Sequence, residues 1–417
     1  MSEQQTNGGP LEGLVVLDLT RILAGPTATQ LMGDLGAEVI KIERPGAGDD
    51  TRAWGPPYVT DAEGRQTRES AYYLSSNRNK RSVSVDIATP EGAALVRRLA
   101  LQADVLVENF KVGGLAKYGL AYADLAAEAP RLIYCSITGF GQTGPNARRA
   151  GYDLLAQGYG GIMSLTGAPD GPPMKVGVGV ADVVCGLYAV SATLAALHWR
   201  ERSGRGQHVD VALVDSAFAW LVNEGVNYLS SGRAPERRGN AHPNIVPYDV
   251  FAAADGHIIV AVGNDGQFRR FAEILGAPGW ADDPRFASNP ARVENRAALT
   301  EAIAARLAGR AGGEVLAAME AAGVPGGPIN RLDEAFGSDQ AQARGMTIAM
   351  PHPLAASGEV ALIGNPLKLS QTPVSYRRAP PVLGADTREV IVSRLGAEAY
   401  AAAKAAGALG EESGDEK

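Results

Sequence analysis

The sequence of 417 residues has few cysteines, few histidines and no excess of positive charge. Its two cysteines, Cys135 and Cys185, are too few for a disulfide framework or a four-ligand zinc site. The five histidines lack the spacing of metal ligands, so no metal site is expected. Acidic residues outnumber basic residues by 46 to 39, and this net charge of −7 argues against nucleic acid as a partner.

The sequence also lacks a long uninterrupted hydrophobic run. Asp, Arg or Gly interrupts each apolar segment before it reaches the roughly 20 residues that a membrane helix needs, so we expect no membrane-spanning segment. The first ten residues, MSEQQTNGGP, have neither the pattern of a signal peptide nor that of a transit peptide. These absences predict a cytoplasmic protein.

The first part of the chain alternates short β-branched segments with helical segments, which is typical of βαβ units and a mainly parallel sheet. A long apolar helix is expected at Val183–Trp199, followed by a strand at Gln207–Val211. The other expected strands are Leu14–Leu19, Glu38–Ile42, Ser82–Ile87, Asp104–Asn109 and Leu132–Ile137, and the other expected helices are Thr27–Leu35, Pro90–Leu101 and Tyr122–Ala127.

The character of the sequence changes near residue 225, where loops rich in Gly, Asn and Pro lead to a strand, His257–Val262, and to Ala-rich helices. A strand at Glu359–Ile363 and a helix at Ala385–Arg394 are expected to return to the first domain. We therefore predict a large domain formed by residues 1–200 and 326–410, a linker at 201–225, a small domain at 226–325 and a disordered tail at 411–417.

Residues Gly139 to Gly144 match the glycine fingerprint of dinucleotide-binding proteins and follow an expected strand. That fingerprint requires a helix that starts at the second glycine. Pro145 and Asn146 follow directly here, and the strand comes late in the sheet. The pattern therefore favours a glycine-rich loop without nicotinamide binding.

The segment from Lys175 to Asp182 alternates Gly and Val and ends at an aspartate before the long apolar helix. One interpretation is that Asp182 caps the helix. The other is that the small residues admit a substrate, to which Asp182 presents a partly desolvated carboxylate as nucleophile. The two interpretations are compatible. His242, in the loop Gly239–Pro243, is either a structural loop residue or part of a site.

Further motifs are spread over residues 11–395. They are LEGLVVLDLT (11–20), AGP (24–26), GDLGAEVIKIERP (33–45), GDDTR (48–52), NRNKRS (77–82), VENF (107–110), YCSITGFGQTGP (134–145), AGYD (150–153) and GRGQ (204–207). Together they resemble the class III coenzyme A transferases, the family that includes formyl-CoA:oxalate transferase. The combination of RAGYD (149–153), NAHPNIVPY (240–248) and GGPIN (326–330) is similar to the branch that moves CoA between dicarboxylic acids such as succinate and glutarate.

The resemblance implies an α/β fold with a Rossmann-like large domain, built from both ends of the chain, and a smaller inserted α/β domain. It also implies a homodimer whose two chains interlock. The implied activity transfers CoA from an acyl-CoA, here succinyl-CoA, to a small carboxylic acid through a covalent aspartyl anhydride and thioester. The implied partners are the acyl-CoA and the acid, and no tightly bound cofactor is required.

The family's catalytic aspartate falls on Asp182, which favours its interpretation as the nucleophile. The positions that contact CoA in the family fall on Ile22, Ala24, Arg44, Asn109, Phe110 and Lys117. Leu23 stands where formyl-CoA transferases carry glutamine, and the His242 segment replaces their glycine-run loop, so oxalate is not the expected acid. A distal carboxylate of the acid needs a partner, and Arg21 and His242 are the candidates.

Two alternatives stay open. An α-methylacyl-CoA racemase of the same superfamily needs a histidine where this chain has Tyr152, and an unperturbed tyrosine is a poor base at neutral pH. The second alternative is a protein that binds acyl-CoA without catalysis.

Overall fold

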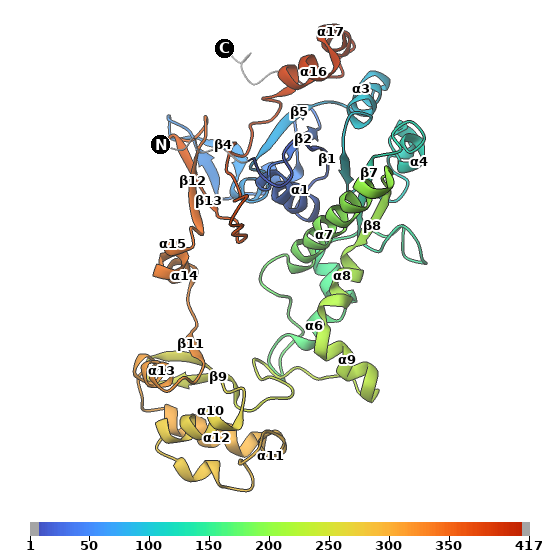
Figure 1. Ribbon diagram of the computed structural model, residues 1–417. Coiled ribbons are helices and arrows are strands. Elements are labelled where there is room, and N and C mark those ends of the chain that lie inside the picture. Colours follow the sequence, from blue (N-terminus) through green and yellow to red (C-terminus); the bar gives the residue numbers. More distant parts are fainter. Residues whose placement is uncertain (1–7, 411–417) are drawn as a thin grey trace. The chain divides into compact units, whose positions relative to one another are not determined.

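The computed structural model describes residues 8–410, which form two compact units (Figure 1). The large unit comprises the described residues up to Ile162, Lys175–Ser231 and those from Gln340 onward, and the small unit comprises Met163–Met174 and Gly232–Asp339. The tail predicted at 411–417 lies outside the described residues.

The large unit is built on a six-stranded parallel sheet. Its strands, in spatial order, are β5 (Lys80–Ser84), β2 (Glu38–Glu43), β1 (Val15–Leu19), β6 (Val105–Glu108), β7 (Ile133–Thr138) and β8 (His208–Ala212). Taken in chain order, this is third, second, first, fourth, fifth, sixth, which is the doubly wound order of the Rossmann fold. The predicted α/β class with a large parallel sheet is confirmed.

Helices cover both faces of this sheet because alternate strand residues are apolar on both sides. On one face, α1 (Ala24–Asp34) and α7 (Val180–Ser203) pack with Val16 and its neighbours. On the other, α3 (Pro90–Ala100), α16 (Thr387–Leu395) and α17 (Ala397–Ala405) pack with Leu17 and its neighbours. The helix α3 begins where its sequence indicates, because the Thr89 hydroxyl caps it by accepting a hydrogen bond from the Gly92 N–H.

The edge strand β5 is covered by a segment from the far end of the chain. The Ser82 N–H donates to Asp386 Oδ2 and the Ser84 N–H to Thr387 Oγ1, each at 3.0 Å. Val85 forms an isolated antiparallel bridge with Leu409. The C-terminal segment therefore completes the sheet that the first residues begin.

The helix α7 is long and apolar enough to cross a membrane by length and composition, and half of its apolar stretch is buried within the protein. It packs closely on α1, where the absence of a side chain at Gly186 leaves room for the Ala24 carbonyl. We therefore interpret it as the core helix of an α/β unit, for which the same length and composition are ordinary.

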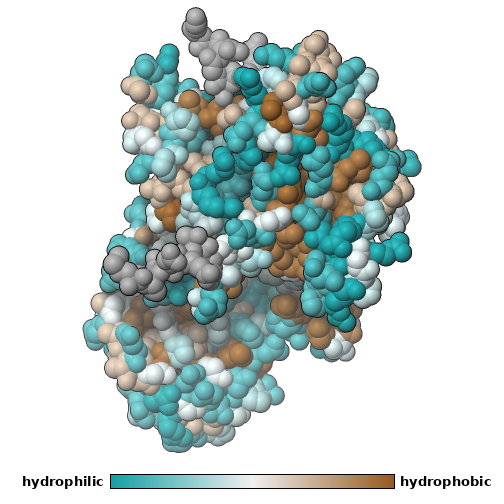
Figure 2. Space-filling view, turned by 45° about the horizontal axis from the view of Figure 1, so that its top comes forward, coloured by the Kyte–Doolittle hydropathy of each residue, from teal (hydrophilic) through white to brown (hydrophobic). Residues whose placement is uncertain are grey.

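Large apolar side chains are nevertheless exposed on the outer faces of α7, α8 (Leu213–Trp220) and α9 (Val222–Ser231). Val222, Val226 and Leu229 follow the i, i+4, i+7 spacing of one helical face, and their exposed fractions are 63%, 60% and 79%. Figure 2 shows hydrophobic residues gathered on the surface in view. Such an extended exposed apolar surface is typical of an interface.

Short elements complete the large unit. They are η1 (Asp50–Ala53), β3 (Tyr58–Thr60), β4 (Gln66–Ser70), α2 (Ala71–Leu74), η2 (Ala116–Tyr118), α4 (Tyr122–Leu125), α5 (Asp153–Tyr159), β12 (Thr347–Pro351) and β13 (Glu359–Ile363). The chain passes between the units four times: within α6 (Ile162–Leu165), after Met174, after Ser231 and at the start of α15 (Asp339–Ala343).

The small unit has its own core around a three-stranded antiparallel sheet in the order β11-β10-β9. Phe251, Val260 and Phe268 belong to this core. Its elements are β9 (Tyr248–Ala253), β10 (Gly256–Ala261), α10 (Asp265–Ile274), η3 (Pro278–Ala281), α11 (Asn289–Glu294), α12 (Arg296–Leu307), α13 (Gly312–Ala321), β11 (Gly326–Pro328) and α14 (Leu332–Gly337).

The observed units differ in extent from the ranges expected for the domains. Residues 201–225, expected as a linker, contain β8 and α8, which belong to the large unit. The small unit continues past residue 325 because β11 pairs with β10.

Candidate active site

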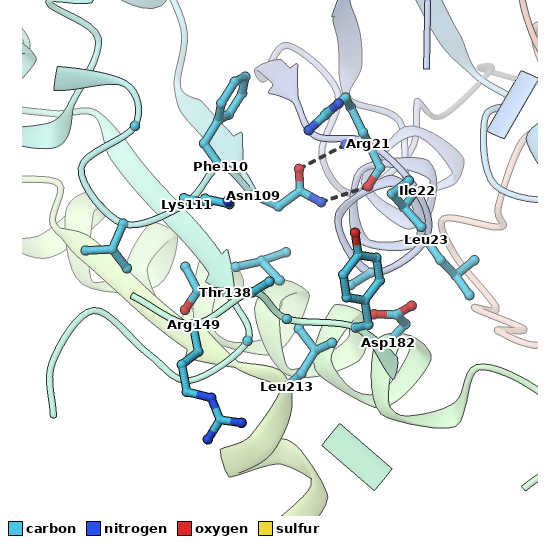
Figure 3. A pocket seen from close by; sticks show the side chains of 18 of the residues that line it. Arg21, Ile22, Leu23, Asn109, Phe110, Lys111, Thr138, Arg149, Asp182 and Leu213 are labelled. Carbon is cyan, nitrogen blue, oxygen red and sulfur yellow. Dashed lines mark hydrogen bonds between the residues drawn. The ribbon is translucent and has the colours of Figure 1, made fainter. Parts of the chain in front are cut away.

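The main cavity of the large unit lies at the carboxyl end of the sheet, where strand order reverses between β1 and β6. Ligands of doubly wound folds bind at such a switch point. The cavity has a volume of about 710 Å³ and is lined by the loops that follow these two strands and by the first turn of α7 (Figure 3).

The two loops are joined by a reciprocal pair of hydrogen bonds. The Arg21 N–H donates to Asn109 Oδ1 at 3.0 Å, and Asn109 Nδ2 donates to the Arg21 carbonyl at 2.7 Å (Figure 3). The neighbouring Phe110 is fixed by its N–H, which donates to Glu108 Oε2 at 2.7 Å. Burial raises the pKa of Glu108 to about 6. The walls of the cavity are therefore held by side chains as well as by the sheet.

Asp182 lies in the first turn of α7 and lines the cavity (Figure 3). Gly179 occupies the N-cap position, so the interpretation of Asp182 as the cap is wrong. The cap comes from Asp153 instead, whose Oδ1 accepts hydrogen bonds from the N–H groups of Ala181 at 2.8 Å and Asp182 at 3.4 Å. The Asp182 side chain is thereby free for chemistry.

Burial sets the protonation of Asp182. The residue is only 9% exposed, and burial, with a contribution from the charge of Asp153, raises its pKa to about 7. Within residues 8–410, no cation pairs with it and no side chain donates a hydrogen bond to its carboxylate. A desolvated carboxylate is a stronger nucleophile than a hydrated one, so this position suits covalent chemistry.

The loop between β7 and α5 shapes the opposite wall. Gly139 and Gly151 lie backbone to backbone, and a Cβ atom on Gly139 would come within 2.4 Å of Gly151 Cα. No helix starts between residues 139 and 152, so these glycines do not form a dinucleotide-binding turn. The expectation of a glycine-rich loop fits this geometry.

A second cavity of about 330 Å³ adjoins the first and shares Arg21, Phe110 and Tyr118 with it. Apolar side chains line it, among them Ile42, Val85 and Ile87, and so does the exposed Arg44. An apolar slot beside an exposed cation suits a planar ring that carries phosphates.

The structure brings most of the predicted site residues together. The first cavity is lined by Arg21, Ile22, Ala24, Asn109, Phe110, Lys117 and Asp182, and Arg44 lines the second. The Lys117 ammonium lies 4.6 Å from the centroid of the Tyr118 ring. Arg21 already forms an ion pair with Asp50 at 2.7 Å.

His242 belongs to the small unit, where its own loop holds it. Its N–H donates to the Tyr248 carbonyl at 3.0 Å, and its Nδ1 accepts from the Asn244 N–H at 3.1 Å. A role for His242 toward substrate therefore stays a prediction.

Sequence reasoning gave no role to Asp153, although its motif was recognised. The residue is 29 positions from Asp182, and neither propensity nor periodicity predicts that one carboxylate caps the helix that carries the other. Within the described part of the chain, no group of three or more His, Cys, Asp or Glu residues is placed to hold a metal ion.

The fold and the cavity define a doubly wound α/β protein with a buried carboxylate at its switch-point pocket. Residues 11–387 match the profile of CoA-transferase family III. A succinate–glutarate CoA-transferase from Agrobacterium fabrum is 52% identical over 392 residues, which are 94% of this chain and 97% of that protein. A succinyl-CoA:glutarate CoA-transferase from Homo sapiens is 44% identical over 382 residues, 92% of this chain and 85% of that protein.

A crystal structure of a CaiB/BaiF family protein from Brucella suis is 48% identical, with a TM-score of 0.81 over 93% of this chain and 100% of that one. The chain therefore belongs to CoA-transferase family III, and it is an enzyme of the CoA-transferase class. Enzymes of this class use CoA thioesters as co-substrates.

Proposed function

We propose that the enzyme transfers CoA from succinyl-CoA to a dicarboxylic acid such as glutarate, with Asp182 as the covalent carrier. The observation that carries this proposal is the placement of the Asp182 carboxylate, which is desolvated, lines the cavity and has no cation partner among residues 8–410. The names of the relatives support the choice of acids.

The first half-reaction moves CoA onto the enzyme. An Asp182 oxygen attacks the thioester carbonyl carbon, the C–S bond breaks, and a mixed anhydride and CoA thiolate result. The thiolate then attacks the aspartyl carbonyl carbon of the anhydride, which releases succinate and leaves an aspartyl-CoA thioester.

The second half-reaction runs these steps backwards with the acceptor. Its carboxylate attacks the aspartyl thioester and releases the thiolate, and the thiolate attacks the acyl carbon of the new anhydride. The products are the new acyl-CoA and the Asp182 carboxylate. Each addition creates an oxyanion, and backbone N–H groups of Gly177–Gly179 are the candidate donors.

The two adjoining cavities suit the parts of CoA. The adenine ring would occupy the apolar slot beside Phe110, and Arg44 and Lys117 would face the phosphates. The acyl end would then extend toward Asp182. For the acceptor, Arg21 stays the candidate partner of the distal carboxylate, and it would exchange Asp50 for the substrate.

A homodimer is part of this proposal. Its support is the set of large apolar side chains exposed on α7, α8 and α9, because an extended exposed apolar surface is typical of an interface. The interlocked arrangement of the two chains is implied by the resemblance described above.

The test replaces Asp182 by Ala and by Asn and measures exchange between succinyl-CoA and labelled glutarate, with butyrate as the monocarboxylate of comparable length. Both variants should lose at least a thousandfold in turnover, because an amide or a methyl group cannot form the anhydride. The exposed Asp170→Asn is the matched control and should retain full activity.

Hydroxylamine added with succinyl-CoA should derivatise Asp182 in the wild type and not in Asp182→Asn. A variant that retains more than about one per cent of turnover would exclude covalent catalysis at Asp182. Binding of CoA without exchange in the wild type would favour the non-catalytic alternative. Equal exchange with butyrate and glutarate would exclude a pocket for the distal carboxylate.

A further inference from the structure

One motif of the sequence, GDDTR (48–52), contains an aspartate that lines neither cavity. The side chain of Asp49 is fully buried and pairs with Lys41, which is equally buried, at 2.9 Å. We infer that the Lys41–Asp49 pair positions the loop Thr20–Leu23 in the conformation that binds acyl-CoA. This inference rests on the proposed function.

The loop needs such support because its backbone is strained. Ile22 has a φ of 74°, in the left-handed region that a β-branched residue rarely adopts. A residue in this region persists only where its surroundings impose the conformation. Asp49 Oδ1 accepts a hydrogen bond from the Ile22 N–H at 3.2 Å.

Lys41 holds the other side of the same turn. Its Nζ donates to the Thr20 carbonyl at 2.8 Å and to Asp49 Oδ2. The ion pair therefore bonds to the backbone on both sides of Arg21, and Asn109 binds Arg21 itself. Side-chain hydrogen bonds therefore fix the backbone at three consecutive residues, Thr20, Arg21 and Ile22.

Asp49 is itself held rigidly. Its Oδ1 also accepts hydrogen bonds from the Thr51 N–H and hydroxyl, and its own N–H donates to Glu43 Oε2 at 2.9 Å. Burial would raise the pKa of Asp49, but Lys41 and Thr51 hold it below its ordinary value, so the carboxylate stays charged. The Lys41–Asp49 pair is therefore rigid enough to hold the loop Thr20–Leu23 in one conformation.

The loop matters because it lines the cavity in which the proposed CoA-contacting residues and Asp182 meet. Ile22, Leu23 and Ala24 line the same cavity as Asp182. Leu23 also contacts the start of α7, where its Cδ2 would lie 3.0 Å from a Cβ atom at Gly179. If the backbone of Ile22 left its positive φ, the shape of the cavity would therefore change even though no residue that lines it had been substituted.

The test compares Asp49→Asn and Lys41→Met with a matched control, Asp34→Asn. Asp34 is an equally buried aspartate that pairs with Arg78 at the other end of α1. Binding of coenzyme A is measured by calorimetry, with kcat and the KM for succinyl-CoA. The first two variants should weaken CoA binding and raise this KM by at least tenfold, with kcat changed less than threefold. Asp34→Asn should change CoA binding less than twofold.

A second comparison covers the case in which a buried variant fails to fold. Ile22→Pro removes the N–H that donates to Asp49 and excludes a positive φ. Ile22→Ala keeps this N–H and still permits a positive φ. The proline variant should bind CoA at least tenfold more weakly than the alanine variant. Equal CoA affinity in these two, or equal losses in Asp49→Asn and Asp34→Asn, would overturn the inference. A wild type that neither binds CoA nor exchanges it would instead overturn the proposed function.

Discussion

The distinctive feature of this site is that two carboxylates, those of Asp153 and Asp182, lie close together. Asp153 caps α7 and at the same time places a negative charge near Asp182. Burial and this charge both disfavour the ionised form of Asp182, so the pKa of the proposed nucleophile lies close to neutral pH.

This arrangement predicts how activity depends on pH. In the proposed mechanism only the ionised Asp182 attacks a thioester, so kcat/KM for succinyl-CoA should rise through about pH 7, the raised pKa of this residue. Asp153→Asn keeps an oxygen for the helix cap and removes the charge, so its profile should shift to lower pH. An unshifted profile in this variant would contradict the assigned role of Asp153. The measurement is initial rate against pH from 5.5 to 8.5.

The same shift has the opposite sign for stability. The pKa of Asp182 rises from 3.8 to about 7 on folding, so the unfolded state releases this proton first, and stability falls between about pH 4 and pH 7. At pH 8, Asp182→Asn should therefore melt at a higher temperature than the wild type, although we expect this variant to be inactive.

Arg44 and Lys117 offer a prediction about CoA. Each to Ala should raise the KM for succinyl-CoA about tenfold and leave the KM for glutarate within twofold, because a charged contact to phosphate is lost. Arg205→Ala, an exposed arginine before β8 at the opposite edge of the sheet, is the control. Unchanged CoA affinity in both variants would mean that these cations are ordinary surface charges.

Among the helices, the contact between α1 and α7 is decisive for the site, since α1 follows the loop Thr20–Leu23 and α7 carries Asp182. A Cβ atom at Gly186 would lie 2.6 Å from the Ala24 carbonyl oxygen. Gly186→Val should therefore separate the helices, destabilise the protein by about 1–3 kcal/mol and raise the KM for succinyl-CoA.

Urea unfolding and steady-state kinetics measure these two effects of Gly186→Val. Ala195→Val, an exposed position of the same helix, introduces the same β-branched side chain and should change stability by less than about 0.5 kcal/mol. Similar losses in both variants would show that the added β-branched side chain itself, and not the close contact with Ala24, is the cause.

The sequence predicted the strands of the sheet well because they are apolar on both faces. Thr89 and Pro90 fixed the start of α3. The pairing of Asp153 with the start of α7 and the strain at Ile22 depend on contacts between segments distant in sequence, which local patterns do not encode. The boundaries of the small unit were displaced for the same reason, since β11 is assigned only by its pairing with β10.

For the whole molecule, the exposed face of α9 predicts its state of association. If it is covered by a second copy, light scattering should give twice the chain mass of 43.4 kDa. Val226→Asp combined with Leu229→Asp should shift this mass toward the monomer, because each charge would be desolvated in the interface. Ala402→Asp combined with Ala405→Asp, at two exposed positions of α17, has the same spacing and should leave the mass unchanged. A monomeric wild type would exclude the dimer.

The cover of β5 has a consequence for the time course of synthesis. About 300 residues separate Ser82 and Ser84 from Asp386 and Thr387. At roughly 5–20 residues per second, a ribosome needs about 15–60 s to translate that interval. During this time the nascent chain presents an open strand edge, which is a template for pairing with other chains. We therefore expect the newly made protein to depend on chaperones until the segment from Asp386 to Leu409 emerges.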